Sequence, residues 1–139
     1  MDKFLLNNKV ESLKEYLEKL KLLCAFTTNE ILADFYKFHT AERLFQLVVD
    51  ISIDINIHII KEKITKLPND FQSTFTTLGE SGIFDQGLMQ KMAPVVGLRN
   101  RIVHRYDTID RVTFIELLKK NLSDFDQYLA IVSSLIKKL

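Results

Sequence analysis

The fold of this chain is decided by residues 44–64, which read LFQLVVDISIDINIHIIKEKI. Its aliphatic residues recur at helical spacing and extend almost all round the axis: Leu44, Leu47, Val48, Ile51, Ile53, Ile55, Ile57, Ile59, Ile60 and Ile64. Pro68 follows and predicts that the helix ends near Lys66. Because a helix that is apolar on nearly all sides must be covered by several others, this stretch predicts a helical bundle. We expect one four-helix chain to leave part of it uncovered, and therefore predict a homodimer.

A first helix is expected on the N-terminal side of this central one. Asn8 and Glu11 have the spacing of an N-cap and its capping partner, and they predict a helix over residues 9–26. The single cysteine, Cys24, lies among apolar residues and is expected to pack rather than to act as a catalytic thiol. One cysteine cannot form an internal disulfide, which fits a reducing cytoplasm.

A second helix is expected between these two. Thr27 and Glu30 repeat the capping pattern and predict a helix over residues 31–38. The second helix either continues into the central helix or kinks near residues 39–40.

Three further helices are expected after the central one. They are a short helix with Phe71, Phe75 and Leu78 inward, a helix over residues 85–105 that contains Pro94, and a last helix over residues 109–138. Gly97 permits the close approach of another backbone, which includes that of a second subunit. The prediction is an all-α chain, an antiparallel helical bundle with additional short helices that forms one domain over residues 1–139.

Most of the aromatic residues are expected in the core of this bundle. Phe35, Phe45, Phe71, Phe75 and Phe125 have the helical spacing of inward positions. Exposed aromatic rings also serve single-strand binders as stacking platforms, and the pattern leaves Tyr36 and Phe38 undecided between the two roles.

Composition limits the function classes. The chain is 47% hydrophobic and 27% charged, which is typical of a globular protein, and a net charge of +1 gives no global basic field. Any nucleic-acid site must therefore be local or built from two subunits. The first residues, MDKFLLN, lack the apolar core of a signal peptide, and the apolar run 51–60 is too short to span a bilayer. We expect a cytoplasmic protein without a membrane segment.

The chemically richest stretch is residues 97–107, GLRNRIVHRYD. On a helix, Asn100 and His104 lie one turn apart on one face, whereas Arg99 lies about 140° from His104. Tyr106 reaches the same cluster only if the helix ends near His104. Such an end is plausible because Asp107 can cap a following helix.

This cluster suits metal-free RNA cleavage. The imidazole of His104 titrates near neutral pH and can take a proton from a 2′-hydroxyl or give one to a leaving 5′-oxygen. The guanidinium of Arg99 has a planar set of donors that fits a phosphate and its transition-state charge. The structural alternative is that these side chains cap a helix end, form ion pairs or are solvated.

A second polar row lies on the central helix. Asp50, Asp54 and His58 follow one another at intervals of four residues. The row is either a solvated or interhelical polar face, or it faces the motif, where a carboxylate such as Asp54 would orient His104. Acid and imidazole at this spacing also suit a metal, but without a second cluster we expect no metal and no cofactor.

The motif Arg-x4-His-x-Tyr, formed here by Arg99, His104 and Tyr106 with Asn100 after the arginine, resembles the signature of HepT toxins in the HEPN superfamily. The resemblance continues in order along nearly the whole chain, through Ala41-Glu42-Arg43, residues 54–60, Leu67-Pro68-Asn69-Asp70, Phe75, Leu78-Gly79 and residues 92–100. One position departs from it, because Arg105 stands where such proteins often have a small or acidic residue.

The resemblance implies a dimeric helical bundle in which two copies of the motif line one cleft. His104 would then be the general acid and base, Arg99 would hold the scissile phosphate, and Asn100 would position His104 or the phosphate. Arg101 and Arg105 would add phosphate contacts. Such an enzyme would cleave RNA and spare DNA, which lacks the attacking 2′-hydroxyl.

The resemblance also implies a protein partner. HepT-like toxins pair with MNT-type nucleotidyltransferase antitoxins, which transfer AMP onto the motif tyrosine, here Tyr106. A bulky anion at that position would exclude the RNA. An alternative from another class is a non-catalytic helical subunit that binds and regulates a nucleotidyltransferase, because Tyr106 would serve it equally well as an acceptor.

Overall fold

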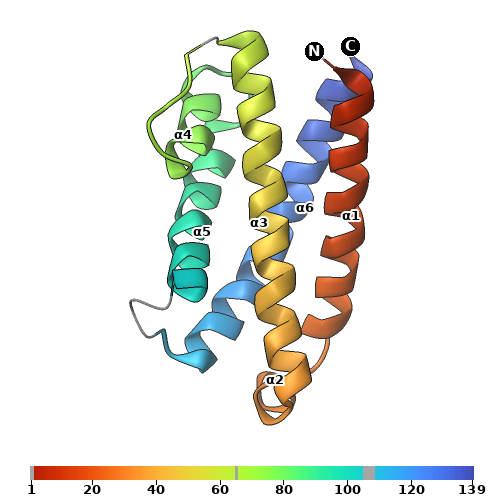
Figure 1. Ribbon diagram of the computed structural model, residues 1–139, viewed down its shortest axis with the longest axis vertical. Coiled ribbons are helices and arrows are strands. Elements are labelled where there is room, and N and C mark those ends of the chain that lie inside the picture. The colour runs from red at the N-terminus through yellow and green to blue at the C-terminus, as the bar shows by residue number, and fades with distance from the viewer. Residues whose placement is uncertain (1, 65, 105–108) are drawn as a thin grey trace.

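The computed structural model describes residues 2–64, 66–104 and 109–139, without the side chain of His104. Within these ranges the chain forms six helices and no strand: α1 (Lys3–Cys24), α2 (Thr28–Ala33), α3 (Phe35–Lys63), α4 (Gln72–Glu80), α5 (Gln86–His104) and α6 (Arg111–Lys137). The long helices α1, α3, α5 and α6 run alternately down and up, with both termini at one end (Figure 1). The predicted all-α antiparallel bundle is confirmed.

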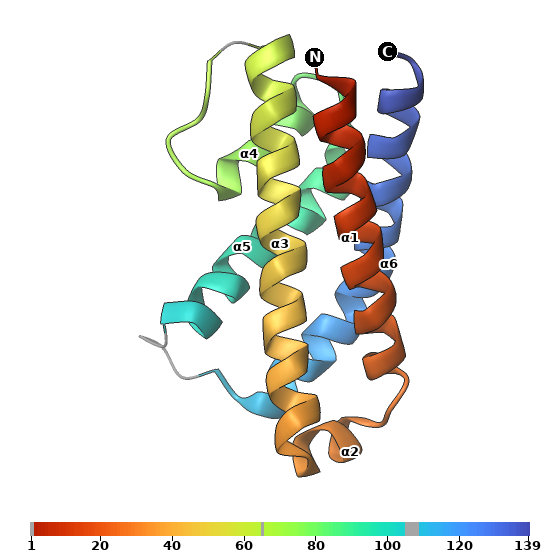
Figure 2. The same ribbon diagram turned by 45° about the vertical axis from the view of Figure 1, so that its right-hand side comes forward.

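The central position of α3 is also as expected. It contacts α1, α2, α4 and α5, and α4 packs closely on α5 (Figure 2). The chain itself buries most of the aliphatic residues of α3. Val48, Ile55 and Ile59 are fully buried, whereas Leu47, Ile51 and Ile57 are partly exposed. Among the described residues, none of the large exposed apolar side chains belongs to residues 44–64. The chain therefore covers most of this helix and leaves a few aliphatic side chains partly exposed, and the dimer remains a prediction.

The N-terminal helix begins earlier than predicted. Asp2, rather than Asn8, is the N-cap of α1, and its Oδ1 accepts a hydrogen bond from the backbone N–H of Leu5 at 3.0 Å. The buried stripe extends back to Leu6, which is fully buried. Because this residue gains a core contact only if the chain is already helical there, packing moves the helix start toward the terminus.

The junction between α2 and α3 resolves the alternative left open by the sequence. Thr27 and Glu30 form the predicted capping box, with hydrogen bonds of 3.1 and 3.2 Å. The break falls at Asp34, before the expected kink near residues 39–40. The Asp34 carboxylate accepts from the backbone N–H groups of Tyr36 and Lys37 and starts a new helix.

The aromatic core is partly as expected. Phe45, Phe75 and Phe125 are fully buried, and Phe38 joins them. Two predictions are wrong, because Phe35 is 69% exposed and Phe71 is 55% exposed. Each stands at the very start of a helix, before the inward-facing stripe of that helix begins.

A buried polar network links α6 to α3 and α4. The hydroxyl of Tyr128 lies 3.0 Å from the carbonyl oxygen of Ser52 and 2.5 Å from Oδ1 of Asn56. Nδ2 of Asn56 donates to Oγ1 of Thr74 at 3.1 Å, and the Thr74 hydroxyl donates to the carbonyl of Phe71. Burial raises the pKa of Tyr128 well above its ordinary value, so the phenol remains a neutral donor.

Close helix approach through glycine occurs at a different position from the one predicted. A Cβ added at Gly79 of α4 would lie 3.0 Å from Cβ of Met89 and 3.1 Å from Cα of Gln86, so α4 packs on α5 through this glycine. A Cβ added at Gly97 would meet nothing within 4 Å. Approach of a partner backbone to Gly97 therefore stays a prediction.

Candidate functional site

Arg99 of α5 is held by Asp50 in the middle of α3. Nε donates to Oδ1 of Asp50 at 2.8 Å and Nη2 donates to Oδ2 at 3.2 Å, which makes the pair bidentate. The side chains are 19% and 36% exposed, respectively. Two parallel hydrogen bonds in a half-buried position fix the plane of the guanidinium, which a single contact would not do.

The same guanidinium keeps donors for a ligand. Nη1 donates to Oδ1 of the neighbouring Asn100 at 3.1 Å. Of the five N–H donors of an arginine, three are thus used within the described part of the chain, which leaves two. Arg99 is therefore oriented by Asp50 and Asn100 and is still able to bind a phosphate oxygen.

The predicted supporting carboxylate, Asp54, is not brought to Arg99. Its Oδ2 lies 3.7 Å from Nζ of Lys9 in α1, and its side chain is 59% exposed. The carboxylate that meets Arg99 is Asp50, one turn earlier on α3. Asp50 and Asp54 lie close in helical phase, but Asp50 pairs with α5 whereas Asp54 lies beside α1.

The polar row on α3 therefore divides into three different environments. Asp50 pairs with α5, Asp54 lies beside α1, and Nε2 of His58 is buried without a hydrogen-bond partner among the described residues. The described residues contain no group of three or more His, Cys, Asp or Glu side chains arranged to hold a metal.

The other described residues of the motif form the last described turn of α5. Ile102 is buried and Val103 is partly buried, so they attach this end to the core, whereas Arg101 is exposed. The described part of α5 reaches His104, and the predicted helix end near Arg105 or Tyr106 lies outside the described residues. The His104 side chain, Arg105 and Tyr106 lie outside the described residues, and the roles predicted for them remain predictions.

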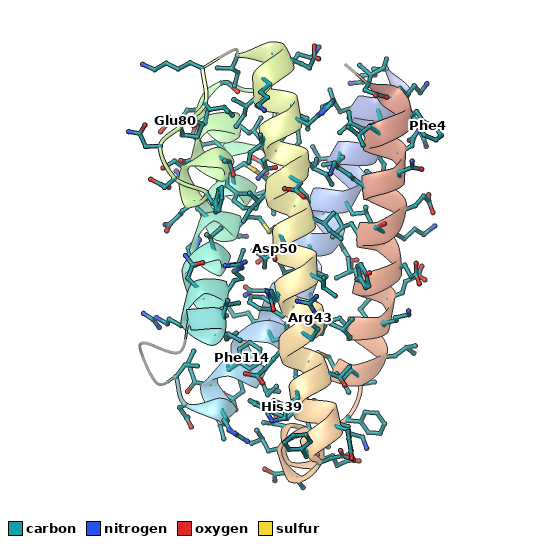
Figure 3. The ribbon with its side chains drawn as sticks, viewed as in Figure 1. Phe4, His39, Arg43, Asp50, Glu80 and Phe114 are labelled. Carbon is teal, nitrogen blue, oxygen red and sulfur yellow. The ribbon has the colours of Figure 1, made fainter. Side chains whose placement is uncertain are left out.

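A second group of polar residues lies near the motif and was not predicted from the sequence. His39, Glu42, Arg43 and Gln46 of α3 face the end of α5, and Figure 3 shows His39, Arg43 and Asp50 at successive levels of α3. Nδ1 of His39 lies 2.7 Å from Oε1 of Glu42. The i, i+3 spacing of this pair was a usable signal.

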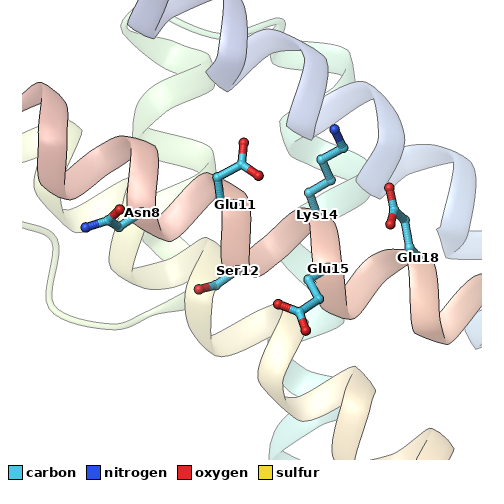
Figure 4. A pocket seen from close by; sticks show the side chains of 6 residues that line it. All are labelled: Asn8, Glu11, Ser12, Lys14, Glu15 and Glu18. Carbon is cyan, nitrogen blue, oxygen red and sulfur yellow. The ribbon is translucent and has the colours of Figure 1, made fainter.

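The outer face of α1 is mainly acidic, in contrast to the surface around Arg99. Figure 4 shows a shallow pocket there, whose lining comes entirely from this one helix: Asn8, Glu11, Ser12, Lys14, Glu15 and Glu18. Three carboxylates repel a phosphate, so this face does not suit RNA.

Cys24 has the properties of a packing residue. It is a free cysteine that lies partly buried against the core. Burial raises the pKa of its thiol, which keeps it protonated and poorly nucleophilic near neutral pH.

The comparison with protein families agrees with this site. The family model described as HepT-like, Ribonuclease HepT-like, matches residues 13–132. The chain belongs to the HepT-like family. All the described residues of the Arg99 site, as well as the motif positions outside the described part, lie within the matched range.

Individual relatives of this HepT-like chain extend over most of its length. It is 33% identical to the tRNA nuclease HepT of Aphanizomenon flos-aquae over 131 residues, which cover 94% of this chain and 88% of the relative. It is 23% identical to the mRNA nuclease HepT of Shewanella oneidensis over 127 residues, which cover 91% of this chain and 95% of the relative.

Solved structures have the same fold. The tri-AMPylated HEPN toxin of Shewanella oneidensis, in complex with an MNT antitoxin, superposes with a TM-score of 0.86 at 22% identity over 96% of this chain and 98% of the toxin. At that identity the likeness establishes the fold of this HepT-like chain. None of the helices in the described ranges has the length and apolar character that a membrane span requires.

Proposed function

We propose that this chain is a metal-independent endoribonuclease toxin that works in the cytoplasm as a homodimer. The observation that supports this most directly is the Arg99 guanidinium, which Asp50 fixes in place and which keeps two donors that are unused among the described residues. The family is a ribonuclease family, and two relatives are named as nucleases of tRNA and mRNA.

In the proposed reaction, the 2′-oxygen of the RNA attacks the adjacent phosphorus while its proton passes to the imidazole of His104. The bond to the 5′-oxygen breaks, and that oxygen takes a proton from an imidazolium. The products are a 2′,3′-cyclic phosphate and a 5′-hydroxyl. Arg99 stabilises the charge that develops on the phosphate oxygens, and Asn100 keeps the guanidinium in position.

A dimer would supply the concentrated positive charge that one chain lacks. Two motifs in one cleft would double the local positive charge of Arg99, Arg101 and Arg105, which the net charge of +1 cannot provide. Light scattering at micromolar concentration is expected to give the mass of two chains. A monomer that cleaves RNA at the full rate would contradict the shared cleft.

The activity is tested with purified protein in excess chelator. We expect wild type to cleave RNA, to leave cyclic phosphate ends and to spare an otherwise identical strand with a 2′-deoxy residue at the cleavage position. His104→Ala is the inactive control. Cleavage that stops in chelator and returns with a divalent ion would contradict the mechanism.

We also propose that an MNT-type nucleotidyltransferase silences the enzyme. The hydroxyl of Tyr106 attacks the α-phosphorus of ATP, pyrophosphate leaves, and the attached AMP blocks the cleft by charge and bulk. A similarly folded HEPN toxin is described as tri-AMPylated in complex with an MNT antitoxin, which supports the proposal.

Intact-mass analysis after incubation with the partner and ATP tests this regulation. Added AMP is expected on wild type and not on Tyr106→Phe, which should remain a toxin. Equal modification of both would place the acceptor elsewhere. A chain that accepts AMP but never cleaves RNA would instead be the non-catalytic regulatory subunit.

A further inference from the structure

A groove lies beside the Arg99–Asp50 pair, and no step of the proposed reaction uses it. It has a volume of about 260 Å³ and is lined by His39, Glu42, Arg43 and Gln46 of α3 and by Ile102 and Val103 of α5. Gln46 lies one turn before Asp50 on α3, and Val103 lies one turn after Arg99 on α5, about 6 Å along each axis. Because the two helices are antiparallel, both residues lie on the same side of the Arg99–Asp50 pair. The groove therefore begins next to the phosphate-binding guanidinium.

The lining has the hydrogen-bonding groups that read a base edge. Glu42 carries a carboxylate that is 19% exposed and lies 2.7 Å from the His39 imidazole, which holds it in place. A carboxylate accepts from an exocyclic amino group, and the amide of Gln46 can both donate and accept. Arg43 is exposed at the rim, where a guanidinium suits a phosphate.

An exposed aromatic ring contacts His39, one of the residues that line the groove. The ring centroid of Phe35 is 4.3 Å from that of His39, which lines the groove, and the Phe35 side chain is 69% exposed. Tyr36 packs edge-on against Phe35 at 5.6 Å and is 80% exposed. Base–aromatic stacking needs such an accessible ring and contributes to the binding of single strands.

We propose that this groove binds one base of the RNA next to the scissile phosphate. Glu42 and Gln46 hydrogen-bond its edge, and Arg43 binds the following phosphate. A base further along the strand stacks on Phe35, which begins α3 about 10 Å along the axis from Glu42. This subsite rests on the proposed ribonuclease function and adds to it the residues that select the cleavage position. The volume is just below the range of about 300–1,000 Å³ for sites that enclose a whole drug-sized ligand, which suits a single base.

Binding and cleavage are measured separately. A dye-labelled pool of random 2′-O-methyl RNA, about twelve nucleotides long, binds without being cut because its 2′-oxygen cannot attack. Phe35→Leu is expected to weaken its binding about 5- to 150-fold, the loss of one stacked base. Phe4→Leu is the matched control, because Phe4 is 77% exposed on α1 and lies at the opposite end of the molecule from His39 (Figure 3).

Sequencing the products of an unmodified random RNA pool tests the base contacts. Glu42→Gln is expected to change the base preference beside the cleavage position, while Asp54→Asn, a carboxylate on the same helix beside α1, leaves it unchanged. An unchanged preference for Glu42→Gln, together with equal RNA affinity of Phe35→Leu and Phe4→Leu, would overturn the subsite while wild-type cleavage stands.

Two other outcomes are informative. A wild type that binds the RNA through Phe35 but never cleaves would remove the proposed enzyme function and keep the binding site. If Phe35→Leu changes the oligomeric mass or binding to the antitoxin and leaves RNA affinity intact, the aromatic residues belong to a protein interface and the proposal is wrong.

Discussion

Two polar clusters on α3, at Asp50 and at Asn56, lie less than two turns apart and have opposite environments. Asn56 and its partner Tyr128 are fully buried in a network whose polar atoms bond to one another. Asp50 is half-exposed, and its partner Arg99 keeps two donors that bond to nothing among the described residues. A satisfied, buried network specifies a packing arrangement, whereas an oriented group with unused donors is ready for a ligand.

The difference indicates separate roles for the two faces of one helix. We expect the Asn56–Tyr128 cluster to determine stability with little influence on the reaction rate, and the Asp50–Arg99 cluster to do the reverse. The predictions that follow test whether these effects separate.

The largest expected effect is on catalysis. Arg99→Ala removes the donors aimed at the phosphate, and we expect cleavage to fall by about 10²–10³-fold or more, with the free energy of unfolding within about 1 kcal/mol of wild type. Lys14→Ala on the acidic face of α1 is the control for a lost surface cation. Equal losses in both variants would reduce the role of Arg99 to general electrostatic attraction.

The next effect is on stability. Tyr128→Phe removes the buried phenolic donor that lies 2.5 Å from Oδ1 of Asn56 and 3.0 Å from the carbonyl of Ser52, which is expected to cost about 1–3 kcal/mol in urea unfolding. Tyr16→Phe is the control, because Tyr16 is partly buried and forms no hydrogen bond within the described ranges. If Tyr128→Phe were fully stable yet slow in cleavage, the two clusters would not have separate roles.

Asp50→Asn sharpens the comparison further. The amide keeps the shape but replaces the charge-assisted bidentate contact, so Arg99 is less firmly oriented, and we expect cleavage to fall about tenfold. Asp54→Asn, one turn away beside Lys9, is expected to cleave at the wild-type rate. The reverse order of the two rates would support the predicted role of Asp54 in orienting His104.

The smallest effect concerns the start of α3. Hydrogen bonding by the backbone N–H of Lys37, and then by its side chain, lowers the pKa of Asp34 below its ordinary value. The folded pKa is therefore below the unfolded one, and this stabilisation is present above the unfolded pKa and lost as the pH falls through the folded pKa. Asp34→Ala should be slightly less stable than wild type near neutral pH, with a smaller difference at about pH 2. An equal difference at both pH values would argue against a charged cap.

The individual helices could be predicted from the sequence, whereas the contacts between helices could not. The period of residues 44–64 predicted α3, and Thr27 and Glu30 predicted a real capping box, because both signals are local. The partner of Arg99 was not predictable in this way. Asp50 and Asp54 are close in helical phase, and the choice depends on the axial offset of α5 along α3, which packing of the whole bundle sets.

The groove residues were missed for a related reason. His39 and Glu42 belong to α3, and Val103 belongs to α5, so no spacing within one helix brings them together. The exposure of Phe35 follows from the helix break at Asp34, whereas the sequence predicted either a continuous helix or a kink near residues 39–40.

The most direct test of the central claim is a double-mutant cycle on single-turnover RNA cleavage. The claim is that Asp50 contributes to the reaction by orienting Arg99. In an Arg99→Ala background, Asp50→Asn is then expected to cause no further loss, so that the double variant cleaves at the rate of Arg99→Ala alone. A further tenfold loss in the double variant would mean that Asp50 acts independently of Arg99, and would contradict the account.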